Sequence, residues 1–372
     1  MTQGNPTNYN MLLFRTMNRQ MGHPNVNDDD LAPLLRDKLM PLRMWWLKSV
    51  PGAMKQMRGA LEHKKLGVPG VVNFVDARTK WFDQQVQVLY INIYFDRCPA
   101  VCAGVVNFVD ARTKWFDQQV QAALTQHGIH QVVAVAAGFD TRAYRFGARY
   151  PGAARFFEVD LPHASAKKQQ LVQQLLQPEA SHPRPVFIGA DLSKVSLDQA
   201  LLEPSYAAAS TAGAAVGFDP TQPTLFTVEG LIYYLPTAAV RQLFASLLRV
   251  AAPGSRVAFD FLHKQVLEGS VPLPPAYKVT AQSVANKGEP FISGIDNYKE
   301  ALAAFMAGIG SSAAAPAAAA AGTPQQQQHR EFKLVQFMTP QEMAAAQLPH
   351  LQWDDKLPPM LSFYSFAAFE VL

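Results

Sequence analysis

From Gln131 onward, the sequence alternates short, almost uninterrupted apolar runs with stretches in which apolar residues have helical spacing. Apolar runs of this length are typical of parallel strands that helices cover on both faces. The predicted strands are residues 132–137, 155–159, 186–189, 224–228 and 256–261. This pattern predicts an α/β fold with a doubly wound, mostly parallel sheet.

The segment Pro236 to Ala252 is the clearest of the intervening helices, because its apolar residues recur every three or four positions and Pro253 and Gly254 follow it. The aromatic segment 362–372 is predicted as a strand that adds to the sheet at an edge or inserts antiparallel at its end. The predicted division is a helical cap at 1–69, a duplicated or inserted segment at 70–103, and a main domain at 104–372 with a low-complexity insertion at 311–328.

Composition excludes several classes of protein. Hydrophobic residues make up 49% of the chain and charged residues 17%, which favours a collapsed globule over a disordered chain. The 33 basic residues barely exceed the 29 acidic ones, and no basic run is longer than two, so no nucleic-acid partner is expected. No apolar window is long enough to span a membrane.

The two cysteines, Cys98 and Cys102, provide neither a disulfide framework nor a usual zinc site. We therefore expect a reducing, cytoplasmic environment and no metal. An organelle remains the alternative, because residues 1–27 contain no acid and carry Arg15 and Arg19.

An exact internal repeat precedes the first predicted strand. Residues 70–87 (GVVNFVDARTKWFDQQVQ) recur letter for letter as residues 104–121. Solenoid repeats drift in sequence and need at least about three copies, so this pair indicates a recent duplication or an error in the gene model. The second copy is predicted to be the native helix, because it continues to a helix stop at Gly128 and then into the first strand. The first copy is then surplus and would expose Phe74, Trp81 and Phe82.

Glycines and acids follow the predicted strands. Gly138 comes after the first strand, but the dinucleotide fingerprint G-x-G-x-x-G is broken by Ala136 and Thr141, which disfavours a pyrophosphate site. Glu158 and Asp160, at the end of the second strand, lie near the distance of about 20 residues at which an acid reaches ribose hydroxyls. The alternatives are an ordinary turn at Gly138 and a solvated carboxylate at the strand end.

Asp191 follows the third strand and Glu229 the fourth. Because ligands bind beyond the carboxyl ends of parallel strands, we expect these acids to lie in one crevice with Gly138 and Asp160. Such a crevice suits a ligand with a ribose, an adenine amine and a positive centre. S-adenosylmethionine is such a ligand.

The region from about Val105 to Phe261 resembles the family of S-adenosylmethionine-dependent methyltransferases that includes leucine carboxyl methyltransferases and bacterial relatives of unknown substrate. The resemblance rests on Ala111-Arg112-Thr113 with Asp117, followed in order by QVVAVAAGFDTRAYRF, FFEVDLP, GADL, GFDPTQPTLFTVEGLIYYLP and APGSRVAFDF. It implies a Rossmann-like class I methyltransferase fold with an N-terminal helical cap. The chain departs from the family at Ala136, where the family has the first glycine of the turn.

The resemblance also implies roles for single residues. Arg112 would contact the carboxylate of the cofactor, Gly138 its methionine portion and Asp160 its ribose. Asp191 and Leu192 would contact the adenine, and Glu229 the amino group or nearby backbone.

For other residues near these motifs, a purely structural role is an alternative to a functional one. Arg112 could be an ordinary helix-surface arginine, and Tyr233 with Tyr234 could be packing aromatics instead of part of the methyl site. Asp140 and Arg142 are expected to be structural partners. His163 is a conceivable base that we do not select, so the catalytic residue stays unassigned.

The leading hypothesis is an S-adenosylmethionine-dependent O-methyltransferase that acts on a small-molecule or carboxylate acceptor, with the cap selecting the acceptor. Methyl transfer from a sulfonium needs alignment and exclusion of water more than a nucleophilic triad. One alternative is a leucine carboxyl methyltransferase that acts on a protein C-terminus. Another is a degenerate cofactor-binding or interaction protein, suggested by Ala136 and the duplication. The sequence does not indicate an oligomeric state.

Overall fold

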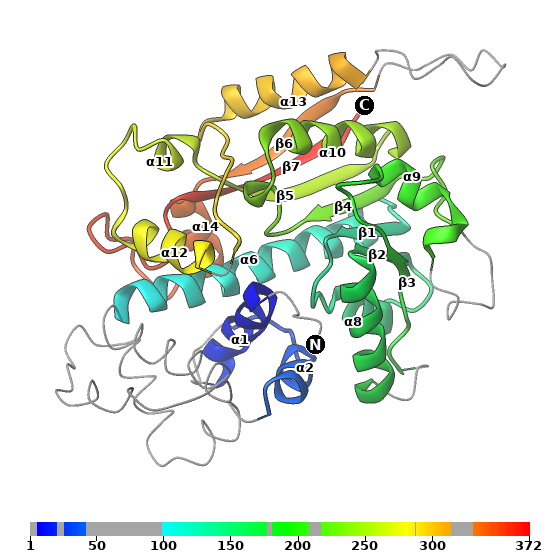
Figure 1. The fold of residues 1–372 in the computed structure, drawn as a ribbon, viewed down its shortest axis with the longest axis horizontal. Coiled ribbons are helices and arrows are strands. Elements are labelled where there is room, and N and C mark those ends of the chain that lie inside the picture. Colours follow the sequence, from blue (N-terminus) through cyan, green and yellow to red (C-terminus); the bar gives the residue numbers. More distant parts are fainter. Residues whose placement is uncertain are drawn as a thin grey trace.

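The computed structural model describes residues 6–20, 26–41, 99–176, 181–207, 217–286, 288–313 and 330–372, and a seven-stranded sheet lies at its centre (Figure 1). The strands are β1 (Gln131–Val135), β2 (Arg155–Asp160), β3 (Val186–Gly189), β4 (Thr224–Val228), β5 (Arg256–Leu262), β6 (Phe332–Met338) and β7 (Tyr364–Val371). Their order is β3-β2-β1-β4-β5-β7-β6. Strands β1 to β5 pair in parallel, and β7 is antiparallel to both β5 and β6. The predicted α/β, doubly wound and mostly parallel fold is confirmed.

The strands follow the apolar runs of the sequence closely. Predicted and observed ends of β1 to β5 differ by no more than two residues. All five residues of β4 are buried, as expected for a central strand that helices cover on both faces. The largest shift is at β1, which ends at Val135 because Ala136 takes a left-handed φ of 53° and turns the chain out of the sheet.

Helices cover both faces of this sheet. In Figure 1, α10 (Thr237–Val250) and α13 (Lys299–Ala313) lie on one side, and α6 (Pro99–Gln126) and α8 (Pro162–Leu175) on the other. The predicted apolar face of α10 is buried, and the left-handed Gly254 follows the end of the helix. The shorter helices are α7 (Arg142–Arg149), α9 (Leu197–Leu202), η3 (Pro204–Tyr206), η5 (Ile232–Tyr234), α11 (Lys264–Leu267), α12 (Pro275–Ala285) and α14 (Pro340–Gln347).

The second copy of the repeat is a core helix. Residues 104–121 lie wholly within α6, where Trp115 and Phe116 are buried. The left-handed Gly128 (φ 61°) follows the helix and leads to β1, as the sequence predicted. The first copy, with Phe74, Trp81 and Phe82, lies outside the described residues, so its expected exposure stays a prediction.

Two helices are described in the predicted N-terminal cap, namely α1 (Pro6–Gln20) and α2 (Ala32–Leu39). Leu12 of α1 and Leu35 of α2 share a buried cluster with Tyr144, Val172 and Phe187 of the sheet region. The described part of the cap is thus joined to α7, α8 and β3 by apolar packing. The division of the chain into domains stays a prediction.

The end of the chain inserts into the sheet. The predicted strand over 362–372 is confirmed as β7, which lies between β5 and β6. The edge strand β6 was missed by the sequence analysis, and its pairing with β7 is interrupted by a register shift between Leu334 and Gln336. Most of the predicted low-complexity insertion at 311–328 lies outside the described residues.

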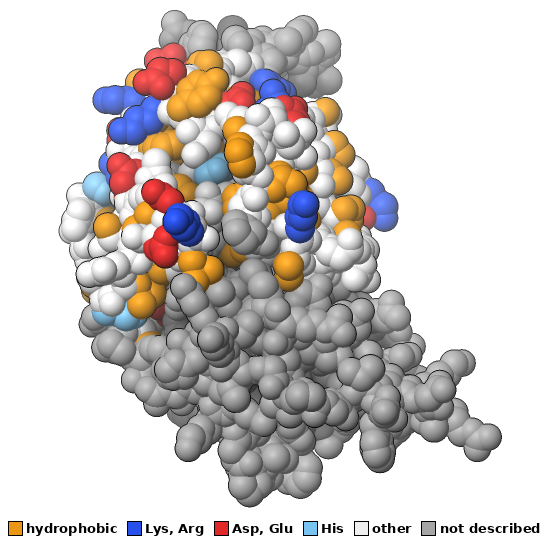
Figure 2. Space-filling model, turned by 90° about the vertical axis from the view of Figure 1, so that its left-hand side faces the viewer, with side chains coloured by type: hydrophobic (Ala, Val, Ile, Leu, Met, Phe, Trp, Pro, Cys, Tyr) orange, Lys and Arg blue, Asp and Glu red, His pale blue; other side chains and the backbone are white. Residues whose placement is uncertain are grey.

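None of the helices in the described ranges is long and apolar enough to cross a membrane. Figure 2 shows the end of the molecule that carries α11 and α12 in Figure 1. On this face, basic and acidic side chains are interspersed with apolar ones and form no continuous basic patch (Figure 2).

Candidate functional site

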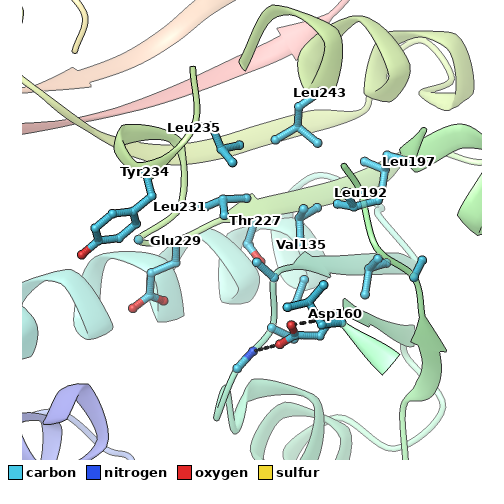
Figure 3. A pocket seen from close by; sticks show the side chains of 18 of the residues that line it. Val135, Asp160, Leu192, Leu197, Thr227, Glu229, Leu231, Tyr234, Leu235 and Leu243 are labelled. Atoms are coloured by element: carbon cyan, nitrogen blue, oxygen red, sulfur yellow. Dashed lines mark hydrogen bonds between the residues drawn. The ribbon is translucent and has the colours of Figure 1, made fainter. Parts of the chain in front are cut away.

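A cavity of about 970 Å³ opens at the carboxyl ends of β1, β2, β3 and β4 (Figure 3). Strand β1 pairs with β2 on one side and β4 on the other, so the cavity lies where the strand order reverses. Open parallel sheets bind ligands at this position. The structure brings all six of the predicted site residues to this cavity: Arg112, Gly138, Asp160, Asp191, Leu192 and Glu229.

The turn after β1 is held by Asp160 from β2. The Gly138 N–H donates to Asp160 Oδ2 at 2.7 Å, and the Leu161 N–H donates to Oδ1 at 2.7 Å (Figure 3). Gly138 has a positive φ of 46°, which a residue without a Cβ adopts readily. Ala136 has a φ of 53° without this advantage, so this position is strained. The carboxylate of Asp160 therefore fixes the turn at the floor of the cavity.

Glu158, the other acid of β2, does not line the cavity. Its Oε2 lies 2.7 Å from Lys168 Nζ, and both side chains are buried. Burial raises the pKa of Glu158 to about 7, although the neighbouring Lys168 acts in the opposite direction. Of the two acids at the predicted ribose distance, only Asp160 reaches the cavity.

The turn after β3 contributes Asp191 and Leu192. Asp191 Oδ1 accepts hydrogen bonds from Ser193 Oγ at 2.6 Å and from the Ser193 N–H at 3.1 Å. These hydrogen bonds and Lys194 lower the pKa of Asp191 to about 2. Leu192 belongs to an apolar wall that also includes Val135, Leu197, Leu231 and Leu243 (Figure 3). This end of the cavity combines an apolar surface with acids that backbone N–H groups hold in place.

The other end contains a buried network of charges. Arg112 of α6 lies with its Nε 3.0 Å from Glu229 Oε1 and its Nη1 3.3 Å from Asp260 Oδ2. Arg142 of α7 places its Nη1 2.7 Å from Glu229 Oε2. Burial alone would raise the pKa of Glu229, but Arg142 and Arg112, together with Arg15, outweigh burial and lower it. Glu229 is therefore an ionised carboxylate among three guanidinium groups, since Arg15 Nη2 of α1 lies 3.8 Å from its Oε1.

The predicted pairing of Asp140 with Arg142 is confirmed, because Arg142 Nη1 donates to Asp140 Oδ2 at 2.7 Å. Arg142 also donates from Nε to Asp117 Oδ1 at 2.7 Å. Burial would raise the pKa of Asp140, but Arg142 and more distant cations hold it well below its usual value. We call Arg112, Arg142 and the carboxylates that contact them, Asp117, Asp140, Glu229 and Asp260, the arginine network.

Sequence reasoning missed several charged residues around the cavity, among them Asp260 and Arg15. Asp260 on β5 accepts from the Gly230 N–H at 2.7 Å and contacts Arg112, and its signal was an acid within the apolar run RVAFDFL. Arg15 on α1 lines the cavity and donates to the Phe139 carbonyl at 3.2 Å. Nothing in the sequence indicated Arg15, because its place depends on how α1 packs against the sheet region.

Of the remaining candidate residues, the two tyrosines line the cavity and the histidine does not. Tyr233 and Tyr234 both line the cavity, and the Tyr233 hydroxyl lies 3.3 Å from Arg112 Nη1 and 3.4 Å from Asp260 Oδ2. His163 is exposed near the start of α8 and does not line the cavity. Within the described ranges, no group of three or more His, Cys, Asp and Glu residues could hold a metal ion.

The comparisons with known proteins agree with the resemblance seen in the sequence. Residues 96–248 match the family model described as leucine carboxyl methyltransferase. A protein of Mycobacteroides abscessus, named "putative S-adenosyl-L-methionine-dependent methyltransferase", is 35% identical over 136 residues, which are 37% of this chain and 39% of that protein. A protein of the same name from Mycobacterium sp. (strain KMS) is 34% identical over 186 residues, 49% of this chain and 53% of that protein. The match therefore spans about half or less of these relatives.

Among solved structures, a DUF574 family protein of Streptomyces avermitilis is similar with a TM-score of 0.49 and 16% sequence identity. The similarity covers 72% of this chain and 85% of that one.

Proposed function

We propose that this chain is an S-adenosylmethionine-dependent methyltransferase, because residues 96–248 match the model of the leucine carboxyl methyltransferase family. We propose that it methylates an oxygen atom of a small-molecule or carboxylate acceptor. The observation that carries the proposal is that one cavity, at the reversal point of the strand order, is lined by all six residues that the family resemblance implies for the cofactor.

The residues at the two ends of this cavity fit such a cofactor chemically. Each oxygen of Asp160 accepts one backbone N–H, so each keeps an acceptor position for a ribose hydroxyl. The apolar wall around Leu192 suits an adenine ring. Arg112 would hold the carboxylate of the methionine portion with its planar donor groups, and Glu229 would accept from the amino group.

The cofactor supplies an activated methyl group on a sulfonium centre. The chain would orient the two reactants and exclude water, which is what an in-line displacement needs. The buried arginine network keeps its charges in place before a ligand arrives, so little reorganisation is required. A carboxylate acceptor is already ionised and needs no base, whereas a hydroxyl acceptor would need one within hydrogen-bond reach. We assign no catalytic base.

Calorimetric titration of the purified chain with S-adenosylmethionine tests the cofactor assignment. We expect binding, and we expect Asp160→Ala to weaken it about 100-fold, because two charge-assisted hydrogen bonds to the ribose are lost. Asp219→Ala is the matched control, since Asp219 also accepts a backbone N–H, from Thr221 at 2.9 Å, but does not line the cavity. Absence of binding heat with the folded, unmutated chain would overturn the proposal.

A radiolabelled methyl-transfer assay tests the reaction. A peptide ending in leucine and a set of small carboxylates and alcohols serve as acceptors. Methylation of the peptide alone would favour a leucine carboxyl methyltransferase of protein C-termini. Cofactor binding without turnover on any acceptor would favour a degenerate, non-catalytic protein, to which the strained Ala136 also points.

A further inference from the structure

We propose that Glu289 and Tyr234 form the acceptor end of the cavity and select a methyl acceptor that carries a cationic nitrogen. This inference rests on the proposed function and adds the chemical class of the acceptor. It follows from how Glu289 is held, from the charges around the cavity, and from the aromatic side chains beside it.

Glu289 lines the cavity from a loop that is fixed at both ends. Its backbone N–H donates to the Val284 carbonyl at 3.1 Å, which anchors it to α12. Three residues later, the Ile292 N–H donates to the Tyr233 carbonyl at 2.9 Å, within η5. Ser293 Oγ donates to the Ile232 carbonyl at 2.9 Å. The loop therefore holds Glu289 against the segment that carries Tyr234.

Glu289 differs from the other acids that line the cavity. Its Oε2 is buried and has no hydrogen-bond partner within the part of the chain that the structure describes. Each of the other lining acids has a partner: Asp140 and Glu229 contact Arg142, Asp160 accepts from two backbone N–H groups, and Asp191 contacts Lys194. A buried carboxylate oxygen without a partner is costly, so a ligand that supplies a donor there gains affinity.

Aromatic side chains surround the same end. The Phe291 ring lies 5.7 Å from the Tyr234 ring and 5.5 Å from the Tyr233 ring, measured between centroids. Tyr233 and Tyr234 line the cavity, while Phe291 packs behind them. Aromatic faces beside a carboxylate favour ammonium and other cationic nitrogen groups.

The geometry leaves the space beside Tyr234 for the acceptor. In Figure 3, Tyr234 and Glu229 lie at one end of the cavity, and Leu192 and Leu197 lie at the other. The proposed cofactor would run from Asp160 and Leu192 to its methionine contacts at Glu229. Tyr234 lies beyond Glu229 in Figure 3, so the space beside Tyr234 is what remains for the acceptor.

Burial raises the pKa of Tyr234 and the negative charge of Glu289 raises it further, while Arg112 acts in the opposite direction, so both charges act on this position. A carboxylate beside Tyr234 would be repelled by Glu289. A cation would be attracted to Glu289, because the charge of the neighbouring Arg112 is compensated by Glu229 at 3.0 Å and Asp260 at 3.3 Å.

Binding of two small probes to the chain saturated with S-adenosylhomocysteine tests the inference. Phenethylammonium and phenylacetate share an aromatic ring and differ in charge, and ligand-observed NMR measures both affinities. We expect the ammonium to bind at least about tenfold more tightly. In Glu289→Gln, which keeps the shape of the side chain, the ratio of the two affinities should fall to near one. The exposed Glu203→Gln variant is the control and should keep the original ratio.

Equal affinity for the two probes, no binding of either, or an unchanged ratio in Glu289→Gln would overturn the inference. Calorimetry on the same variant separates an acceptor role from a cofactor role. Glu289→Gln should bind S-adenosylmethionine and S-adenosylhomocysteine as the unmutated chain does. A selective loss of S-adenosylmethionine affinity would instead assign Glu289 to the sulfonium and overturn the inference, while the proposed function would stand. If neither cofactor form binds the unmutated chain, the proposed function fails first.

Discussion

The two ends of the cavity hold their acids in different ways. At the Asp160 end, carboxylates accept hydrogen bonds from backbone N–H groups in tight turns. At the Glu229 end, the carboxylates contact arginines that come from α6 and α7, and both partners are largely buried. The first arrangement is made by backbone groups at neighbouring strand ends, and the second depends on helices that pack together.

Because of this difference, substitutions at the two ends should affect different properties, namely ligand affinity at one end and stability at the other. Backbone N–H groups leave lone pairs on Asp160 for a ligand, so its loss should act mainly on affinity. The arginine network contains buried charges whose partners cannot be removed without leaving an uncompensated charge, so its loss should act mainly on folding. The substitutions described below test this contrast.

The largest effect is expected from Arg142→Met. The variant leaves Asp117, Asp140 and Glu229 without a cation that each contacts at 2.7 Å. We expect a loss of about 3–5 kcal/mol in the free energy of unfolding, measured by urea denaturation. Arg249→Met is the control, because its pair with Asp198 is partly exposed, and about 1 kcal/mol or less should be lost. Similar losses in the two variants would contradict the contrast.

The difference in the free energy of unfolding between Arg142→Met and the unmutated chain should depend on pH. In the folded chain the pKa of Asp140 is held below its usual 3.8, against the effect of burial, chiefly by Arg142. A lowered pKa adds stability above pH 3.8 that is lost as the pH falls through and below this value. The variant lacks this contribution. Urea titrations at pH 7 and pH 3 should therefore show that this difference in the free energy of unfolding is smaller by about 1 kcal/mol at pH 3. A larger difference at pH 3 than at pH 7 would contradict this prediction.

Ala136→Gly examines the turn at the Asp160 end. Relief of the left-handed strain at Ala136 is worth about 1–2 kcal/mol. Glycine also makes the unfolded chain more flexible, which lowers the free energy of unfolding by about 0.4–1 kcal/mol. We expect a net gain of roughly 0.5 kcal/mol in thermal denaturation, with cofactor affinity equal or higher. Ala137→Gly is the neighbouring control, and it should destabilise because Ala137 does not have a positive φ. A less stable Ala136→Gly would show that the alanine is not strained.

Asp191→Ala should have the smallest effect. Asp191 is partly exposed and contacts only its own turn and Lys194, among the described residues. We expect an unchanged melting temperature and a loss of cofactor affinity smaller than that of Asp160→Ala. A loss of affinity greater than that of Asp160→Ala would mean that the adenine end, and not the ribose contact, dominates binding.

The sequence predicted the elements and site residues whose signals are local. Strands β1 to β5 have nearly continuous apolar runs, and Gly138, Asp160, Asp191 and Glu229 each follow one of them closely. The parallel topology then brings them to one edge. The separation of Glu158 from Asp160 could not be predicted, because it depends on Lys168 of α8. Strand β6 was missed because its burial is only partial, with a half-exposed pattern that resembles neither a central strand nor a clean alternation.

The position of β7 has a consequence for the order of folding. Strand β6 precedes β7 along the chain, but β7 lies between it and β5. Until β7 is in place, β6 has no neighbouring strand to pair with, and the edge of β5 stays open. Docking of β7 joins residues as far apart in sequence as Arg256 and Glu370, so closing this loop is entropically costly and late. An intermediate with an open β5 edge would be the species most prone to aggregate during refolding.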